Sequence, residues 1–256
     1  MEESGLSTIR LFVPGPLRTG VQIDLDEARA HYLARVMRRA EGDPLELFDG
    51  RSGGFAGRIT GLGKRSATVA VLDKLQDLPE RAAAPVLFQA IIRRPRLEWL
   101  VEKATELDVA AIVPVRSQRI AHPLGRTERL HAIAVEAAEQ SGRLDVPVIH
   151  GETPLAAIGP LRRPGRPLLV LDPLAEAGAL GLLGRDPDGA DLLIGPEGGL
   201  APEDDAVLAG LPDVVRGRLA PTVLRAETAA LAALAASIML RRHEAPPSVE
   251  SLQTDE

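Results

Sequence analysis

Residues 192–199 (LLIGPEGG) join an apolar stretch to a glycine-rich turn that carries one carboxylate, Glu197. A helix is expected to begin just after this turn, near Pro202. In an open parallel sheet, ligands bind beyond the carboxyl ends of the strands, and glycine there lets the backbone approach a ligand closely. The segment therefore indicates either a ligand site or a plain strand-to-helix turn, and taken alone it favours neither.

A second charged segment, residues 219–229 (LAPTVLRAETA), runs from a predicted strand end into the last predicted helix. It places Arg225 at the start of that helix, where the helix dipole prefers an anion to a guanidinium. Arg225 therefore either forms an ion pair, with Glu227 or another carboxylate, or serves a ligand.

A third segment, residues 136–147 (EAAEQSGRLDVP), is by itself typical of a helix end that a strand follows. Gly142 would cap the helix, and Arg143 would satisfy its last carbonyls.

The sequence argues against several classes of chemistry. Neither GxxxxGK[ST] nor GxGxxG follows a predicted strand, which argues against nucleotide hydrolysis and dinucleotide redox chemistry. The chain has no cysteine, which rules out disulfides, thiolate metal sites and cysteine nucleophiles. The five histidines lack metal-binding spacing, so no metal is predicted. They are His31, His122, His131, His150 and His243.

The N-terminal third predicts a small β-barrel over residues 1–78, because short apolar runs alternate with turns rich in Gly and Asp. One helix, over residues 26–39, would interrupt the barrel and present Arg35, Arg38 and Arg39 on one face. Residues 79–85 resemble a linker. The expected strands are 10–13, 45–48, 55–59 and 67–72.

From residue 86 onward, apolar strands alternate with helices, which predicts a parallel sheet with helices on both faces. This second domain would span residues 86–243, and residues 244–256 would form a disordered tail. The expected strands are 86–92, 110–115, 168–171 and 192–194, and the expected helices are 96–107, 128–140 and 227–242.

The chain of 256 residues lacks an apolar run long enough to cross a bilayer, and its first residues are acidic. We therefore expect a cytoplasmic protein. The net charge of −6 argues mildly against a protein that coats nucleic acid. Two basic segments without acids, 29–40 and 51–72, nevertheless lie in the N-terminal third.

The three charged segments together resemble one family. Residues 136–143 (EAAEQSGR), 194–199 (IGPEGG) and 224–229 (LRAETA) occur in the order found in the 16S ribosomal RNA uracil-N3 methyltransferases, the RsmE family of the SPOUT superfamily. The resemblance covers nearly the whole chain, since residues 10–13 (RLFV) and 31–38 resemble the PUA-like barrel of that family.

The resemblance implies an α/β chain with an N-terminal PUA-like β-barrel and a C-terminal SPOUT parallel-sheet domain that contains a trefoil knot. It also implies a homodimer that uses S-adenosylmethionine to methylate N3 of a specific uridine in 16S ribosomal RNA, as naked RNA or in the assembled small subunit. The sequence departs from the family pattern in several places, and one of them is residues 93–96 (RRPR), which replace a Lys-Gly-Asp-Arg-like turn. Asp108 stands in place of a glycine, Ala220 tests whether the backbone there needs a positive φ, and Thr222 removes a cation.

For the cofactor, the resemblance implies backbone contacts from the loops 195–199 and 217–224, with apolar walls around them. The expected cofactor-binding residues are Leu171, Ile194, Gly195, Glu197, Gly198, Gly199, Leu219, Ala220, Leu224 and Ala229.

For catalysis, the N3 proton of uracil must leave, and a cation should stabilise the resulting negative charge. Our hypothesis gives that role to Arg225. Glu227 could orient Arg225, or Glu197 could accept the proton, and the sequence does not decide between them. The expected RNA-binding residues are Arg10, Arg35, Arg38, Arg39, Arg119 and Arg143.

Three alternatives stay open. The same fold could methylate another base of ribosomal or transfer RNA, or it could serve as a non-catalytic RNA-binding factor in ribosome assembly. An unrelated α/β enzyme whose glycine loop binds another nucleotide is the third. A measurement of cofactor binding would distinguish the non-catalytic factor from a methyltransferase.

Overall fold

The computed structural model describes residues 9–80, 83–119, 123–185 and 189–240. The expected tail at 244–256 lies outside them. The chain divides into two compact units: unit 1 comprises residues 1–81 and 128–147, and unit 2 comprises 82–127 and 148–256. No described helix is long and apolar enough to span a membrane.

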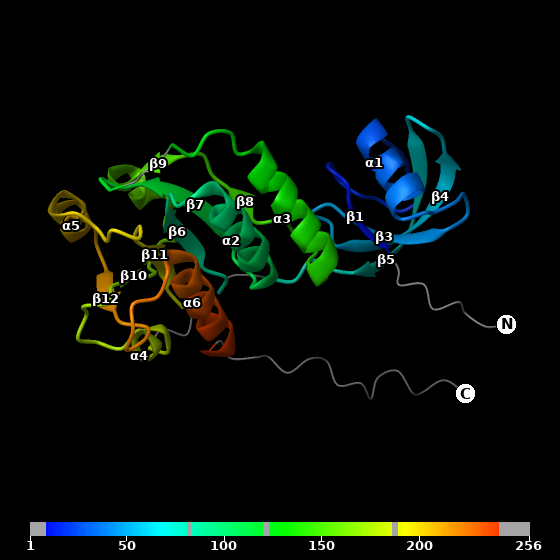
Figure 1. The fold of residues 1–256 in the computed structure, drawn as a ribbon. Coiled ribbons are helices and arrows are strands. Elements are labelled where there is room, and N and C mark those ends of the chain that lie inside the picture. Colours follow the sequence, from blue (N-terminus) through cyan, green and yellow to red (C-terminus); the bar gives the residue numbers. More distant parts are fainter. Residues whose placement is uncertain (1–8, 81–82, 120–122, 186–188, 241–256) are drawn as a thin grey trace, which may run out of the picture. The chain divides into compact units, whose positions relative to one another are not determined.

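Unit 1 contains a five-stranded sheet in the order β1-β3-β4-β5-β2 (Figure 1). β1 runs parallel to β3, and the remaining neighbours are antiparallel. The four expected strands are present, and the sequence analysis missed β2, a short strand at the end of the sheet order. The strands are β1 (Ile9–Phe12), β2 (Gln22–Leu25), β3 (Pro44–Phe48), β4 (Gly54–Leu62) and β5 (Ala67–Gln76).

The helix expected over residues 26–39 is shorter than predicted. It consists of α1 (Glu27–His31) and one π-helical segment, η1 (Tyr32–Val36). Arg38 has φ 52° and so ends the helix, and the N–H of Arg39 donates to the carbonyl of Leu33 at 2.9 Å. The prediction that Arg35, Arg38 and Arg39 share one helical face is therefore wrong, because two of them follow the helix.

Helix α3 (Glu128–Ser141) belongs to unit 1, although the sequence placed it among the helices of the second domain. The N–H of Phe12 in β1 donates to Glu139 Oε1 at 2.9 Å. Burial raises the pKa of Glu139 above its usual value. The hydrogen bond from the N–H of Phe12 lowers this pKa but does not outweigh burial. Phe48, Ala138 and Leu144 form a buried apolar cluster that joins the sheet to the helix and to the segment that follows it.

Unit 2 contains a seven-stranded sheet in which every recorded pairing is parallel, in the order β12-β10-β11-β6-β7-β8, with β9 also paired to β7. Because the strands are parallel, their carboxyl ends lie at one edge of the sheet. The strands are β6 (Val86–Ala90), β7 (Ala111–Arg116), β8 (Val148–Ile149), β9 (Thr153–Pro154), β10 (Leu168–Leu171), β11 (Asp191–Ile194) and β12 (Val214–Gly217).

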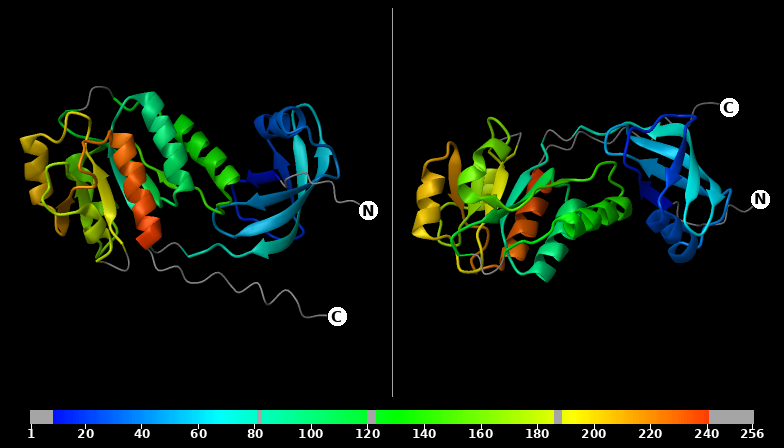
Figure 2. Two further views of the ribbon diagram at one scale, coloured as in Figure 1. Left: turned by 60° about the horizontal axis from the view of Figure 1, so that its bottom comes forward. Right: turned by 90° about the horizontal axis from the view of Figure 1, so that it is seen from above.

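Helices cover this sheet, as its alternating apolar pattern predicted. Helices α2 and α6 contact each other and lie side by side in Figures 1 and 2. Helix α5 packs over the short 3₁₀ turn η2, where its Leu208 joins the core formed by Phe88, Val113 and Val170. The elements are α2 (Arg94–Glu106), α4 (Ala179–Leu183), α5 (Pro202–Ala209), α6 (Ala226–Leu240), η2 (Leu155–Ala157) and η3 (Gly159–Leu161).

The path of the chain near its C-terminal end departs from a simple winding order. β12 is an end strand beside β10, yet α6 packs against β11, α2 and α4. Between them, the N–H of Arg218 donates to the carbonyl of Ala177, and the N–H of Ala179 donates to the carbonyl of Arg218. The segment between β12 and α6 thus begins alongside residues 177–179, which follow β10 in the chain. Residues 219–225 are irregular rather than the expected strand end.

The turn between β3 and β4 depends on Asp49 and Gly53. Asp49 is buried, and its carboxylate accepts N–H groups from Leu17, Arg51 and Ser52 at 2.6–2.8 Å. Burial alone would raise the pKa of Asp49, but these hydrogen bonds outweigh it and hold the pKa below its usual value. Gly53 has φ +99°, and a Cβ at this position would overlap the carbonyl oxygen of Gln76.

We predict that Gly53→Ala lowers the free energy of unfolding by roughly 3 kcal/mol or more, because it adds a backbone clash to an unfavourable φ. Gly20→Ala is the matched control, since φ is +85° and nothing lies within 4 Å of its Cβ. It should cost only about 1–2 kcal/mol. Chemical denaturation measures both, and equal losses would contradict this account of the turn.

Candidate functional site

A cavity of about 440 Å³ lies at the carboxyl ends of β10 and β11 in unit 2. Most of its wall comes from three segments: the loop after β10, the glycine-rich loop after β11, and the segment that leads into α6. Arg119, Asp205 and Arg216 complete the lining. All ten residues that the sequence suggested for the cofactor line this one cavity. They are Leu171, Ile194, Gly195, Glu197, Gly198, Gly199, Leu219, Ala220, Leu224 and Ala229.

The glycine-rich loop turns sharply and is held at its far end by α5. Gly199 has φ +73°, and its N–H donates to the carbonyl of Pro196 at 2.9 Å. The buried carboxylate of Asp204 accepts the N–H of Ala201 at 2.9 Å and that of Gln118 at 3.1 Å, which fixes the start of α5 to the segment after β7. The loop therefore presents its backbone to the cavity from a fixed position.

Two of the departures from the family pattern, Ala220 and Asp108, concern the backbone conformation. The φ of Ala220 is not positive, so this part of the cavity wall does not require a glycine. Asp108 has φ 58°, a left-handed conformation that glycine adopts without strain and aspartate tolerates.

One end of the cavity carries an ion cluster that the sequence analysis missed. Arg216 in β12 donates to Asp172 at 2.9 Å and to Asp205 at 2.6 Å, and all three residues line the cavity. Burial favours the neutral guanidine, but the two carboxylates outweigh it and raise the pKa of Arg216 above its usual value. Asp172 lies 44 positions before Arg216 in the sequence, and only its position directly after a strand indicated a site.

The three candidate catalytic residues lie in different environments. Glu197 lines the cavity. Glu227 is buried, with a side chain that is 8% exposed, and its nearest cation is Arg96 rather than Arg225. Arg225 is exposed and does not line the cavity, although its neighbours Leu224 and Ala226 do. No ion pair between Arg225 and Glu227 occurs in the described residues.

Arg96, in the first turn of α2, joins the two candidate acids. Its Nη1 lies 3.1 Å from Glu197 Oε1, and its Nε lies 3.5 Å from Glu227 Oε1. Arg96 was not among the predicted site residues, since nothing in the local sequence ties this residue to acids more than 100 positions later. A second cavity of about 420 Å³ adjoins the first. It is lined by Ile91, Ile92, Arg93, Arg96, Arg119, Glu197 and Gly198.

The candidate RNA-binding arginines divide by unit. In unit 2, Arg119 lines both cavities and donates to the carbonyl of Gly198 at 2.7 Å. In unit 1, Arg35 and Arg38 are exposed, and Arg39 is half-buried.

Arg10 and Arg143 have partners within unit 1. Arg10 pairs with Glu46 at 2.9 Å and lies over the ring of Phe48, 5.2 Å from its centroid. Arg143 is buried and pairs with Asp145 at 2.9 Å, beside Gly142 with φ +81°. Carboxylates of unit 1 thus hold both side chains, and RNA binding by Arg10 and Arg143 stays a prediction.

Comparison with known families agrees with the fold. A family model described as an RNA methyltransferase domain matches residues 79–238, and one described as an RNA methyltransferase PUA domain matches residues 25–72. The chain is thus an RNA methyltransferase with a PUA domain. Ribosomal RNA small subunit methyltransferase E of Mycobacterium bovis is 30% identical over 243 residues, which cover 90% of this chain and 91% of that protein. The chain belongs to the ribosomal RNA small subunit methyltransferase E family, which confirms the resemblance seen in the sequence.

Two solved structures are similar over nearly the whole chain. The enzyme of this family from Neisseria gonorrhoeae, bound to S-adenosyl methionine, has 29% identity and a TM-score of 0.80, with 91% of this chain and 98% of that chain covered. A methyltransferase of Legionella pneumophila, in complex with the bound cofactor SAM, has 28% identity and a TM-score of 0.82, with 92% and 97% covered.

No group of three or more possible metal-binding side chains occurs among the described residues. His122 and His243 lie outside them.

Proposed function

We propose that this chain methylates N3 of a specific uridine in the 16S ribosomal RNA of the small subunit, with S-adenosylmethionine as the methyl donor. The observation that carries the proposal is the convergence of all ten expected cofactor residues on one cavity. That cavity lies at the carboxyl edge of a parallel sheet, where ligands of α/β folds bind. The structures of two similar proteins contain this cofactor.

The residues around the cavity suit S-adenosylmethionine. Leu171, Ile194 and Leu224 provide apolar walls for a purine ring, and the glycine-rich loop, which also lines the cavity, offers it backbone hydrogen-bonding groups. The ion cluster of Arg216, Asp172 and Asp205 offers both charges to the amino-acid end of the cofactor. When bound, the cofactor supplies an activated methyl group on a sulfonium. The chain then has to position the acceptor and exclude water.

For the chemical step, Arg225, Glu227 and Glu197 stay the proposed catalytic residues. Arg225 is at the cavity rim between two lining residues, where its guanidinium is free to approach RNA from outside. Glu197 faces the cavity and is suited to accept the proton of N3.

We also propose that the C-terminal segment forms a trefoil knot. Two features support it: the last segment hydrogen-bonds to residues 177–179 of the loop after β10, and α6 returns across the sheet to pack against β11. An ordinary doubly wound sheet has no need of either feature.

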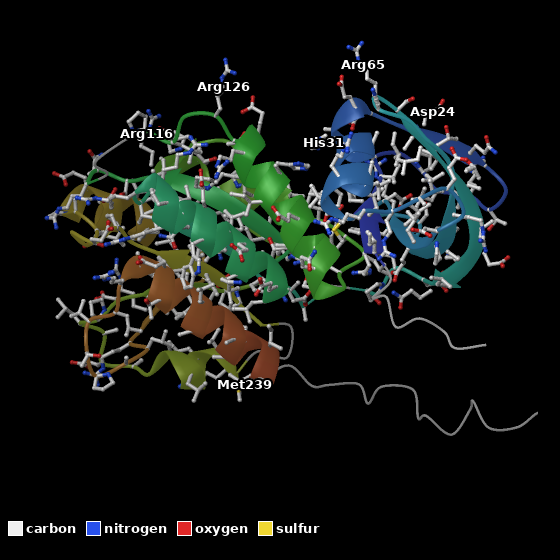
Figure 3. The ribbon with its side chains drawn as sticks, turned by 45° about the vertical axis from the view of Figure 1, so that its right-hand side comes forward. Asp24, His31, Arg65, Arg116, Arg126 and Met239 are labelled. Atoms are coloured by element: carbon white, nitrogen blue, oxygen red, sulfur yellow. The ribbon has the colours of Figure 1, made fainter. Side chains whose placement is uncertain are left out.

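A homodimer is proposed from the exposed apolar side chains of unit 2. Leu174 and Val223 are 90% and 81% exposed on the cavity rim, and Met239 at the end of α6 is 80% exposed and labelled in Figure 3. Such side chains are typical of a surface that a second copy covers. A solution mass of one chain at micromolar concentration, measured by light scattering, would contradict the dimer.

RNA binding is proposed for the PUA-like barrel, which we take as residues 1–78, with a linker at 79–85 and the methyltransferase domain at 86–243. The exposed Arg35 and Arg38 are suited to phosphate contacts there. We expect the enzyme to act in the cytoplasm, where small subunits assemble. The proposal favours small-subunit RNA over other RNAs because the chain belongs to that family.

The direct test is transfer of labelled methyl from S-adenosylmethionine to small ribosomal subunits that lack their own N3-methyluridine, followed by nucleoside mass spectrometry. We predict newly formed N3-methyluridine. Cofactor binding with no methylated nucleoside would reject the proposed reaction in favour of the non-catalytic alternative. A different methylated base would reject the proposed acceptor alone.

Ala229→Leu should weaken binding of S-adenosylmethionine about 5- to 150-fold, because the added carbons fill the cavity, which corresponds to about 1–3 kcal/mol of overpacking. Thr228→Leu is the matched control, since Thr228 precedes it on α6, is exposed and does not line the cavity. Isothermal titration calorimetry measures both affinities. Unchanged affinity in Ala229→Leu would mean that the cofactor binds elsewhere.

A further inference from the structure

The second cavity lies where an acceptor would meet the methyl donor. Ile91 and Ile92 follow β6, and Glu197 and Gly198 follow the neighbouring strand β11. Since both strands end at the same edge of the sheet, the two cavities adjoin and share Arg119, Glu197 and Gly198 as wall residues. Transfer between two ligands requires such contact between their sites.

The charges around the second cavity suit an anionic ligand with a flat ring. Three arginines, Arg93, Arg96 and Arg119, face one carboxylate, Glu197. The guanidinium of Arg93 is exposed and makes no hydrogen bond or ion pair within the described part of the chain. Ile91 and Ile92 are each only 4% exposed and provide an apolar floor. A nucleotide combines these features, with a phosphate and a planar base.

Arg96 is held in this cavity by two carboxylates of different kinds. Glu197 is 45% exposed and faces the cavity beside Arg96, whereas Glu227 is 8% exposed and lies behind it. Glu227 Oε2 is buried without a hydrogen-bond partner among the described residues, so the ion pair with Arg96 is the main compensation for its charge. Glu227 therefore acts as a positioning residue that fixes the guanidinium.

The pair of Arg96 and Glu197 presents a hydrogen-bond donor and an acceptor side by side. A guanidinium has five N–H donors, and Nη2 of Arg96 has no partner in the described residues. The Watson–Crick edge of uracil offers the complement, an N3–H donor beside a carbonyl acceptor. When N3 lies at Glu197 and C4 lies towards Arg96, cytosine places an acceptor on the carboxylate and a donor on the guanidinium, so both contacts have the wrong polarity. Cytosine fits the pair only when the ring shifts to bring N4 to Glu197, which moves N3 out of the position that uracil N3 occupies.

We propose that the second cavity is the acceptor subsite, in which Arg96 and Glu197 select uracil over cytosine and Arg93 and Arg119 take the nucleotide phosphate. This inference rests on the proposed function, since it assigns the acceptor site of that reaction. Arg96 then contacts the base directly, and Arg225 approaches from the rim.

The test measures binding of uridine 5′-monophosphate and cytidine 5′-monophosphate by NMR titration, with no cofactor present. The wild-type chain should bind the uridine nucleotide more tightly. Arg96→Met should weaken that binding at least about tenfold and abolish the preference, because it removes charge-assisted donors. Its affinity for S-adenosylmethionine should stay unchanged. Glu227→Gln should reduce the preference, and Glu227→Asp should retain more of it.

Arg94→Met is the matched control. Arg94 lies on the same turn of α2 and pairs with Glu98 at 2.9 Å, but it does not line the cavity. It should bind both nucleotides as the wild type does. If Arg96→Met unfolds because Glu227 is left unpaired, the double variant Arg96→Met/Glu227→Met removes both charges and should show the same loss.

Full retention of uridine nucleotide binding and preference in a folded Arg96 variant would overturn the subsite. So would the absence of saturable binding to the wild type. Either result leaves the methylation assay on ribosomal subunits unaffected. Conversely, a failed methylation assay with intact, Arg96-dependent uridine binding would reject the proposed reaction while keeping the subsite.

Discussion

The parallel alignment of the strands in unit 2 is the constraint on which the site depends. It brings the carboxyl ends of β6, β10 and β11 to one edge, so that loops from distant parts of the sequence meet there. These strands are mostly apolar and buried, and Asp172 and the glycine-rich turn lie just beyond their ends. Both cavities follow from this arrangement.

A second constraint is the cost of a buried carboxylate. Glu227 is buried at the start of α6, and a buried charge needs a fixed cation. Arg96 meets this need across the contact between α2 and α6, and in doing so it becomes fixed beside Glu197. The same ion pairs that join two helices thereby orient a guanidinium towards the glycine-rich loop.

The sequence predicted best what local patterns encode. The apolar strands 168–171 and 192–194 followed from contiguous apolar residues. The residues around the first cavity followed from the resemblance to a family, and the structure brings them together. Arg96 and Arg216 were missed because their roles depend on partners remote in sequence. The prediction that Arg35, Arg38 and Arg39 share one helical face was wrong for a local reason. A π-helical turn and the positive φ of Arg38 end the helix early.

We propose that the two adjoining cavities hold the methyl donor and its acceptor. The most direct measurement is a crystal structure of this chain with S-adenosylhomocysteine and uridine 5′-monophosphate. The account predicts the first ligand among residues 171–174, 194–200 and 219–229, and the uracil ring beside Arg96 and Glu197. Density for the cofactor product outside the first cavity, or for the nucleotide away from Arg96, would contradict it.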